Sequence, residues 1–254
     1  MTDAPLAPGR PPIGMTLAAL LRADFTVLAR TPQVLVTNLA VPIIFIVATS
    51  FGKRDFAEPG TLIGLALSYG TMSAGMLGYS TLVAQDRASG VFQRLRVTPT
   101  PSWAIMASRI VVQLVSAVVM TVLGVVVGSI AHGVVYEWHQ YLAVLGVSLL
   151  GAAMFLCTGQ AIVGLLRSPA SVNAVGRVLF ILLIISGILG SIGVLGDWFT
   201  VFSQWTPVGA LTSLYAVAFG AAWSDATTAG AIMVPVYAVV CAFVGIRFFR
   251  WESR

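Results

Sequence analysis

The sequence predicts an all-α polytopic membrane protein with six transmembrane helices. Of its 254 residues, 58% are hydrophobic and only 9% are charged, whereas a soluble domain carries about 25% charged residues. Several uncharged runs reach the roughly 20 residues that cross the hydrocarbon core of a bilayer. Most of the protein surface must therefore face lipid rather than water.

The N-terminal region is expected to stay outside the bilayer core. Residues 1–12 contain four prolines and no apolar centre, which predicts a flexible cytoplasmic arm rather than a signal peptide. Residues 13–31 place apolar side chains at helical spacing, but Arg22, Asp24 and Arg30 interrupt them. This pattern is typical of an amphipathic helix that lies in the membrane interface. Residues 13–254 are expected to form a single transmembrane domain.

The six predicted spans follow from the apolar runs between the charged segments. They cover about residues 34–52, 61–84, 103–131, 141–166, 178–196 and 226–246. Residues 197–225 are too apolar for a solvated loop, but Pro207 and Gly209 break them. We expect one or two short re-entrant helices there, on the outer side of the membrane before the last span.

The distribution of charge predicts the orientation of the chain. All Lys and Arg residues except Lys53 and Arg54 fall on the side of the two termini. The acidic residues on the other side are Asp55, Glu58, Glu137, Asp197 and Asp225. Cytoplasmic loops of membrane proteins collect Lys and Arg. Both termini are therefore expected in the cytoplasm. As a separate expectation, the chain is a multi-pass protein of the cell membrane, the inner membrane of a bacterium.

The spans lack the side chains that an enzyme or an ion-coupled transporter requires. No acidic residue and neither histidine falls inside a predicted span, whereas ion-coupled transporters usually carry such a group at membrane depth. Gly52 and Lys53 are not part of an ATP-binding loop, because Val47 and Arg54 break the pattern. A membrane-embedded enzyme and an ion-coupled secondary transporter both rank low. A partner that hydrolyses ATP is the simplest source of energy for transport.

The polar segment 85–101 (QDRASGVFQRLRVTPTP) lies between the second and third spans. Residues 86–96 can form a short helix with Val91, Phe92 and Leu95 as apolar contacts and arginines around them. Such a segment could dock in a groove of another protein. The alternative is a basic loop held at anionic lipid headgroups. The residues alone favour neither interpretation.

Residues 86–99 (DRASGVFQRLRVTP) resemble the loop of type-2 ATP-binding-cassette (ABC) transporter permeases, in the short drug- and antibiotic-export group. That pattern reads acidic–Arg–Glu–x–Gly, followed by Arg–Leu–Arg–x–x–Pro, and Ala88 replaces its second acidic residue. The resemblance implies a dimer of permeases, identical or paralogous, that binds two ABC ATPase subunits. The ATPases would hold ATP and Mg, and this chain would bind no cofactor or metal. The implied coupling residues are Asp86, Arg87, Gly90, Val91, Phe92, Arg94, Leu95 and Arg96.

The resemblance implies export of a hydrophobic small molecule such as a drug or an antibiotic, with a lipid or a lipid-linked glycan as the alternative. A candidate substrate path includes Asn38 in the first span. In the second span, aromatic and methionine side chains recur at helical spacing, at Tyr69, Met72, Met76 and Tyr79. Such side chains form adaptable apolar surfaces. Packing or lipid contact is the favoured alternative, because stripes of this kind are common in membrane spans.

Glycines recur every three residues at the end of the fifth span, at Gly187, Gly190, Gly193 and Gly196. They could let a neighbouring helix approach closely. They could also loosen the span where the outer segment begins. The sequence does not separate these two interpretations.

Overall fold

The computed structural model describes residues 13–30, 32–51, 58–91 and 102–248, and the elements in this part of the chain are all helical. The predicted arm at residues 1–12 lies outside the described residues. The helices are α1 (Ile13–Arg30), α2 (Pro32–Ser50), α3 (Pro59–Met72), η1 (Ser73–Gly78), α4 (Tyr79–Ala88), α6 (Ser102–His132), α7 (Trp138–Leu165), α8 (Pro169–Ile192), α9 (Asp197–Trp205), α10 (Pro207–Ala218) and α11 (Asp225–Phe248).

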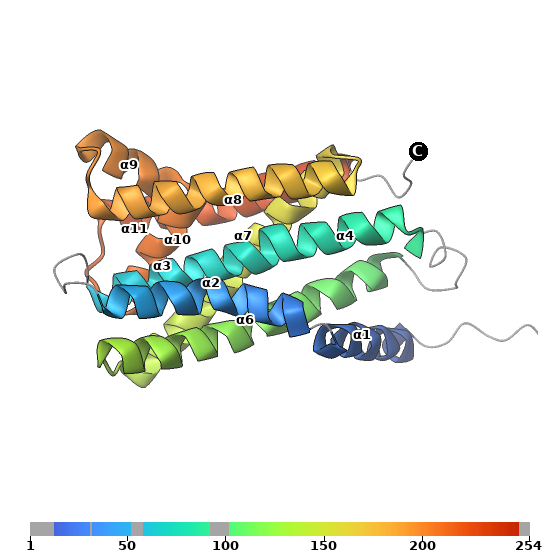
Figure 1. Ribbon diagram of the computed structural model, residues 1–254, viewed down its shortest axis with the longest axis horizontal. Coiled ribbons are helices and arrows are strands. Elements are labelled where there is room, and N and C mark those ends of the chain that lie inside the picture. Colours follow the sequence, from blue (N-terminus) through green and yellow to red (C-terminus); the bar gives the residue numbers. More distant parts are fainter. Residues whose placement is uncertain (1–12, 31, 52–57, 92–101, 249–254) are drawn as a thin grey trace, which may run out of the picture.

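The long helices run side by side along the long axis of the molecule, and α1 turns away from them (Figure 1). In this view α2, α6 and α8 are seen along their length, whereas the turns of α1 overlap. α1 packs against α6 near one end of the bundle. A helix that leaves the direction of the bundle at its end is consistent with the predicted interfacial position.

Four of the predicted spans coincide with helices that are long and apolar enough to cross a membrane. They are Ala104–His132, Trp138–Leu165, Pro169–Ile192 and Asp225–Phe248. The first predicted span coincides with α2, whose described apolar part, Leu39–Ser50, is shorter. The second coincides with α3, η1 and α4, none of which is long enough alone. Six spans therefore remain a prediction.

The second predicted span contains a π-helical stretch that the sequence analysis did not anticipate. α3, η1 and α4 follow one another without a break, and their junction residues keep right-handed helical dihedrals. Within η1, a Cβ on Gly75 would lie only 2.9 Å from the backbone of α7 at Phe155 and Leu156. The missing side chain lets η1 and α7 touch through their backbones.

The glycines at the end of α8 serve both of the functions that the sequence left open. Gly187 and Gly190 lie buried inside α8, and a Cβ on Gly190 would clash with Ser203 of α9. Gly193 ends α8 in the left-handed conformation, with φ of 70°, which glycine adopts without steric cost. The first two glycines therefore pack, and Gly193 and Gly196 form the turn into α9.

The predicted outer segment forms two short helices, α9 and α10. α10 begins where Thr206 accepts a hydrogen bond from the Gly209 N–H at 3.2 Å, with Pro207 in the first turn. It packs against α3, α7 and α11. Its side chains Leu211 and Tyr215 are fully buried and belong to the main core. The outer segment is therefore an integral part of the bundle.

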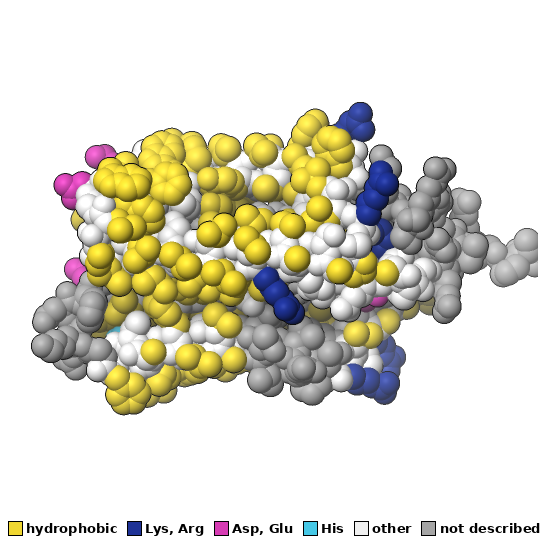
Figure 2. Space-filling model, turned by 45° about the horizontal axis from the view of Figure 1, so that its top comes forward, with side chains coloured by type: hydrophobic (Ala, Val, Ile, Leu, Met, Phe, Trp, Pro, Cys, Tyr) yellow, Lys and Arg dark blue, Asp and Glu magenta, His cyan; other side chains and the backbone are white. Residues whose placement is uncertain are grey.

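Charge separates toward the two ends of the bundle. Most Lys and Arg side chains visible in Figure 2 lie toward one end, and acidic side chains lie mostly at the other. The first end, where α4 and α7 finish, is called the basic end below. The other, where α7, α9 and α11 begin, is called the acidic end. This agrees with the charge pattern in the sequence, and a cytoplasmic basic end remains a prediction.

Candidate functional site at the basic end

The predicted coupling segment starts in the last turn of α4. Gln85, Asp86 and Arg87 are still helical, and the Ser89 N–H bonds to the Gln85 carbonyl at 2.9 Å. Gly90 then has φ of 73°, a left-handed conformation that side-chain-bearing residues rarely adopt. Gly90 therefore forms a left-handed turn directly after α4.

The remaining predicted coupling residues are placed only in part. Val91 is half-buried directly after the bend. Phe92, Arg94, Leu95 and Arg96 lie outside the described residues, as does the predicted short helix beyond Val91. The described part of the site is therefore the anchor of the segment, at Asp86, Arg87 and the turn that follows.

Arg87 is a buried cation that bonds to the end of α7. Its side chain is only 4% exposed. Its Nη1 donates to the Val163 carbonyl at 3.0 Å, and its Nη2 donates to the carbonyls of Leu166 at 2.6 Å and Arg167 at 2.8 Å. The last carbonyls of a helix lack partners inside the helix and carry partial negative charge. Arg87 therefore caps α7 through a charged donor.

Burial lowers the pKa of the Arg87 guanidinium from its ordinary value. That ordinary value is so far above neutrality that the side chain stays charged. A cation of this kind must have polar partners, because an unpaired buried charge is strongly unfavourable. The carbonyls at the end of α7 supply them, so Arg87 is occupied within the chain and is not available on the surface.

Asp86 points to a different neighbour. Its carboxylate pairs with the guanidinium of Arg109 on α6 at 2.5 Å, with 21% of the Asp86 side chain and 12% of the Arg109 side chain exposed. Ser108, which precedes Arg109 on α6, is fully buried and donates to the carboxylate of Asp24 on α1 at 2.5 Å. Hydrogen bonds with an ionised partner are stronger than neutral ones.

These contacts connect four helices at one end of the bundle. α4 bonds to α7 through Arg87 and to α6 through Asp86, and α6 bonds to α1 through Ser108. A force on the end of α4 would therefore reach α6 and α7 through these contacts, and α1 through α6. The arrangement holds no reactive group. It can hold the start of the predicted coupling segment in place and transmit movement to the neighbouring helices.

The candidate substrate-path residues of the second span lie inside the bundle. Tyr69, Met72, Met76 and Tyr79 are each at most 5% exposed. The Tyr69 hydroxyl donates to the Ile184 carbonyl at 3.0 Å, and the Tyr79 hydroxyl donates to Gln160 Oε1 at 2.8 Å. This burial favours the packing interpretation. The backbone of Asn38 lies in α2, and its side chain lies outside the described part.

Sequence reasoning did not find the partners of the coupling segment. Asp24 was identified only as a charge that interrupts an apolar helix, and neither Arg109 nor Ser108 was singled out. A usable signal was present, because a charged residue within a predicted span requires a partner, and Arg109 is such a residue. On the same predicted side of the membrane, the acidic residue nearest to Arg109 in sequence is Asp86.

Comparison with known protein families gives a match over most of the chain. The family model described as "ABC-2 type transporter" matches residues 15–219. No curated protein matches the chain. The matched range begins in α1 and includes the whole site at the basic end, and it ends just after α10.

Proposed function

The chain belongs to the ABC-2 type transporter family, and on that premise we propose that it is the permease of an ATP-driven exporter. Members of this family are membrane components of ABC transporters. In the proposal, two permeases, identical or paralogous, form a dimer in the bacterial inner membrane. Each has six spans and cytoplasmic termini, and each binds one ABC ATPase subunit through residues 85–101.

The anchoring of the coupling segment is the observation that carries this proposal. Arg87 joins the segment to the end of α7, and Asp86 joins it to α6. A loop that only contacted lipid headgroups would not require buried charged contacts with two other helices. Arg87 and Asp86 hold the start of the segment in one position, and in the proposal the residues that follow Gly90 bind the ATPase.

The positions of the acidic residues support an external energy source. Within the described ranges, Asp86 lies near the end of α4 and pairs with Arg109. The others are Asp24 on α1 and four residues at helix N-termini: Glu58, Glu137, Asp197 and Asp225. Carboxylates at N-termini interact favourably with the helix dipole. An ion-coupled mechanism would instead need such a group near the middle of a span.

ATP-driven closure of the two ATPases would move residues 85–101 in each permease. The movement would reach α7 through Arg87 and α6 through Asp86, and the spans would then open the path to the outside. The transported molecule is proposed to be hydrophobic and small, of the drug or antibiotic type. A lipid or a lipid-linked glycan is the alternative, and stimulation of ATPase activity by each class would separate them.

The docking segment can be tested by reversing its chemistry. The double substitution Arg94→Glu with Leu95→Asp removes one apolar contact and one cation from the proposed helix. We expect the ATPase to stop copurifying with the permease, while the permease still elutes as a folded protein. Arg177→Glu is the matched control, because it reverses an exposed arginine on α8, outside the segment.

Three results would contradict the proposal. An unchanged amount of copurified ATPase in the double variant would place the docking site elsewhere. A purified chain that transports substrate with a proton gradient and without any ATPase would exclude the exporter altogether. Loss of ATPase in both the double variant and the Arg177→Glu control would also count against it, since the effect would then follow general charge rather than this segment.

A further inference from the structure

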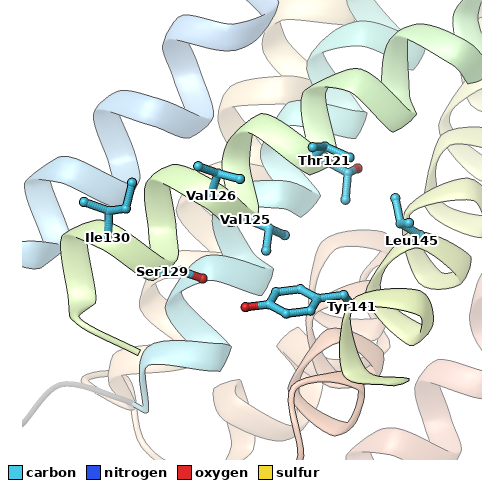
Figure 3. A pocket seen from close by; sticks show the side chains of 8 residues that line it. Thr121, Val125, Val126, Ser129, Ile130, Tyr141 and Leu145 are labelled. Carbon is cyan, nitrogen blue, oxygen red and sulfur yellow. The ribbon is translucent and has the colours of Figure 1, made fainter. Parts of the chain in front are cut away.

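A cavity of about 330 Å³ lies between α6 and α7 near the acidic end, away from the coupling segment. Figure 3 shows Val125, Ser129 and Tyr141 directed into the same space. Its lining side chains come from residues 121–130 of α6 and from Tyr141 and Leu145 of α7. Its size is within the usual range for sites that hold small molecules, about 300–1,000 Å³.

The cavity opens toward the lipid-facing surface of α6. Val122, Val126 and Ile130 form one edge and are 47%, 50% and 77% exposed. Their spacing of four residues places them on one face of the helix. The deeper wall is buried, since Thr121 is 1% exposed and Val125 is 7% exposed. A molecule in the bilayer could therefore enter from the side.

Two hydroxyl groups give the cavity a polar end. The Ser129 Oγ is buried and has no hydrogen-bond partner among the described residues. The Tyr141 hydroxyl accepts a bond from the Tyr136 N–H at 3.2 Å, which leaves its proton available. The Thr121 hydroxyl already bonds to the Ala117 carbonyl at 2.8 Å. An unpartnered buried hydroxyl is costly, and a bound acceptor would satisfy both Ser129 and Tyr141.

The polar end lies at the depth of the membrane interface. Ser129 is one helical turn from the end of α6 at His132, and Thr121 is about 12 Å deeper along the helix. Tyr136, Trp138 and Tyr141 gather next to this end, and Trp138 is 74% exposed. Tyr and Trp concentrate where lipid headgroups meet hydrocarbon. The cavity thus runs from the interface toward the hydrocarbon core.

We propose that this cavity binds one acyl chain of a bilayer glycerophospholipid. The chain lies along Val125 and Leu145, and its ester carbonyl accepts hydrogen bonds from Ser129 and Tyr141. The ester of a phospholipid combines an acceptor at interface depth with a long apolar chain below it, which matches the two ends of the cavity. This site is separate from the proposed coupling segment and requires no ATPase.

Photochemical crosslinking tests the site directly. The chain, with any subunits that copurify, is placed in nanodiscs of phosphatidylglycerol and phosphatidylcholine that carry a diazirine on one acyl chain. After irradiation without ATP, mass spectrometry locates the labelled residues. We expect strong labelling within residues 121–130 and 141–145, above that of the lipid-facing residues Val111, Val115 and Val119 on the same helix.

Two variants test the site, one by blocking its entrance and the other by removing a hydrogen-bond donor. Val126→Trp fills the exposed entrance and should remove the preference for residues 121–130. Val119→Trp is its matched control, because Val119 is equally exposed on α6, at 52%, but does not line the cavity. Ser129→Ala should keep the fold and reduce the preferential labelling about fivefold, the effect of one neutral hydrogen bond.

Three outcomes would overturn the proposal. Equal labelling of residues 121–130 and of Val111, Val115 and Val119 would mean that only annular lipid contacts this face. Undiminished labelling in both Val126→Trp and Ser129→Ala would mean that the lipid binds elsewhere. Labelling that is absent from the cavity in a dimer would mean that a second copy of the chain covers it. None of these results depends on ATPase docking.

Discussion

Charged side chains join the helices at the basic end, whereas at the acidic end glycines let the helices touch. Arg87 donates three hydrogen bonds to the end of α7, and Asp86 pairs with Arg109 of α6. At the other end, Gly190 of α8 and Gly209 of α10 both lie against Ser203 of α9, with no room for a Cβ.

The difference concerns how each end can respond to movement. Polar groups can exchange a protein partner for water or for another protein group, at a net loss of about 1 kcal/mol per neutral bond. Close-packed atoms cannot move closer to each other without overlap, and they cannot separate without leaving a void. We therefore expect the basic end to rearrange during transport while the acidic end moves as one unit. The following substitutions test this contrast, from the largest expected effect to the smallest.

Replacing Arg87 should have the largest effect. Arg87→Met keeps a long apolar stem but leaves the carbonyls of Val163, Leu166 and Arg167 without their donors. Bonds from charged donors contribute about 1.5–3 kcal/mol each, and water can replace part of this at a helix end, so we expect a total loss of about 3 kcal/mol. Unfolding of the purified permease in detergent measures it.

The exposed Arg177 provides the comparison for Arg87, since Arg177→Met should change the free energy of unfolding by no more than about 0.5 kcal/mol. If Arg87→Met were equally neutral, the carbonyls at the end of α7 would not depend on this side chain. Arg87 would then have no anchoring function in the coupling segment.

At the acidic end, Gly190→Ala should be nearly as harmful. The added Cβ would overlap the Ser203 side chain, and overpacking of this kind costs about 1–3 kcal/mol. The free energy of unfolding should fall accordingly, and Ser203→Gly in the same chain should restore part of it. Gly146→Ala is the control. A Cβ there meets nothing within 4 Å, so the helix should gain up to about 1 kcal/mol.

The pair formed by Asp86 and Arg109 should contribute less. Asp86→Asn keeps the shape of the side chain and removes its charge, and we expect a loss of about 1.5 kcal/mol, at the lower limit for a bond to a charged group. A double-mutant cycle with Arg109→Gln isolates the coupling of the two side chains. Strictly additive losses in that cycle would show that the two groups do not stabilise each other.

The smallest effect is expected at α1. Ser108→Ala removes the bond to Asp24, and α1 should open more often, by about 1 kcal/mol. Hydrogen exchange of the α1 amides should accelerate while exchange in α7 stays unchanged. Ser116→Ala serves as control, because Ser116 bonds to the Val112 carbonyl of its own helix and to no other helix within the described residues. Equal acceleration in both variants would show that Asp24 does not hold α1.

The sequence predicts helix boundaries best where a proline, a glycine or a capping residue marks them. Pro207 lies in the first turn of α10, as the predicted break indicates. α8 ends at Ile192, before the predicted end of the fifth span at residue 196, because Gly193 takes the left-handed conformation. α8 starts earlier than the predicted span at residue 178, because Ser168 accepts a hydrogen bond from the Ser171 N–H and Pro169 follows it. That start signal is present in the sequence. The predicted span nevertheless began at residue 178, because the charged Arg177 was placed outside it.

The contacts of the site were less predictable for a physical reason. The partners of Arg87 are backbone carbonyls at least 76 residues away in sequence, and a carbonyl has no signature in the residue type. Ser108 likewise resembles any serine in an apolar helix. The π-helical stretch also lacked a signal, because the second span is apolar on every side, so its pattern of hydrophobic residues cannot show a change in helical period.

That π-helical stretch determines which way the coupling segment faces. A π-helical turn contains more residues than an α-helical one, so η1 sets the angular phase between α3, which packs in the core, and α4, which carries Asp86 and Arg87. Deleting one residue within 73–78 would turn α4 by about 100° relative to α3. The two side chains would then point away from α6 and α7, although every residue of the segment itself would be unchanged.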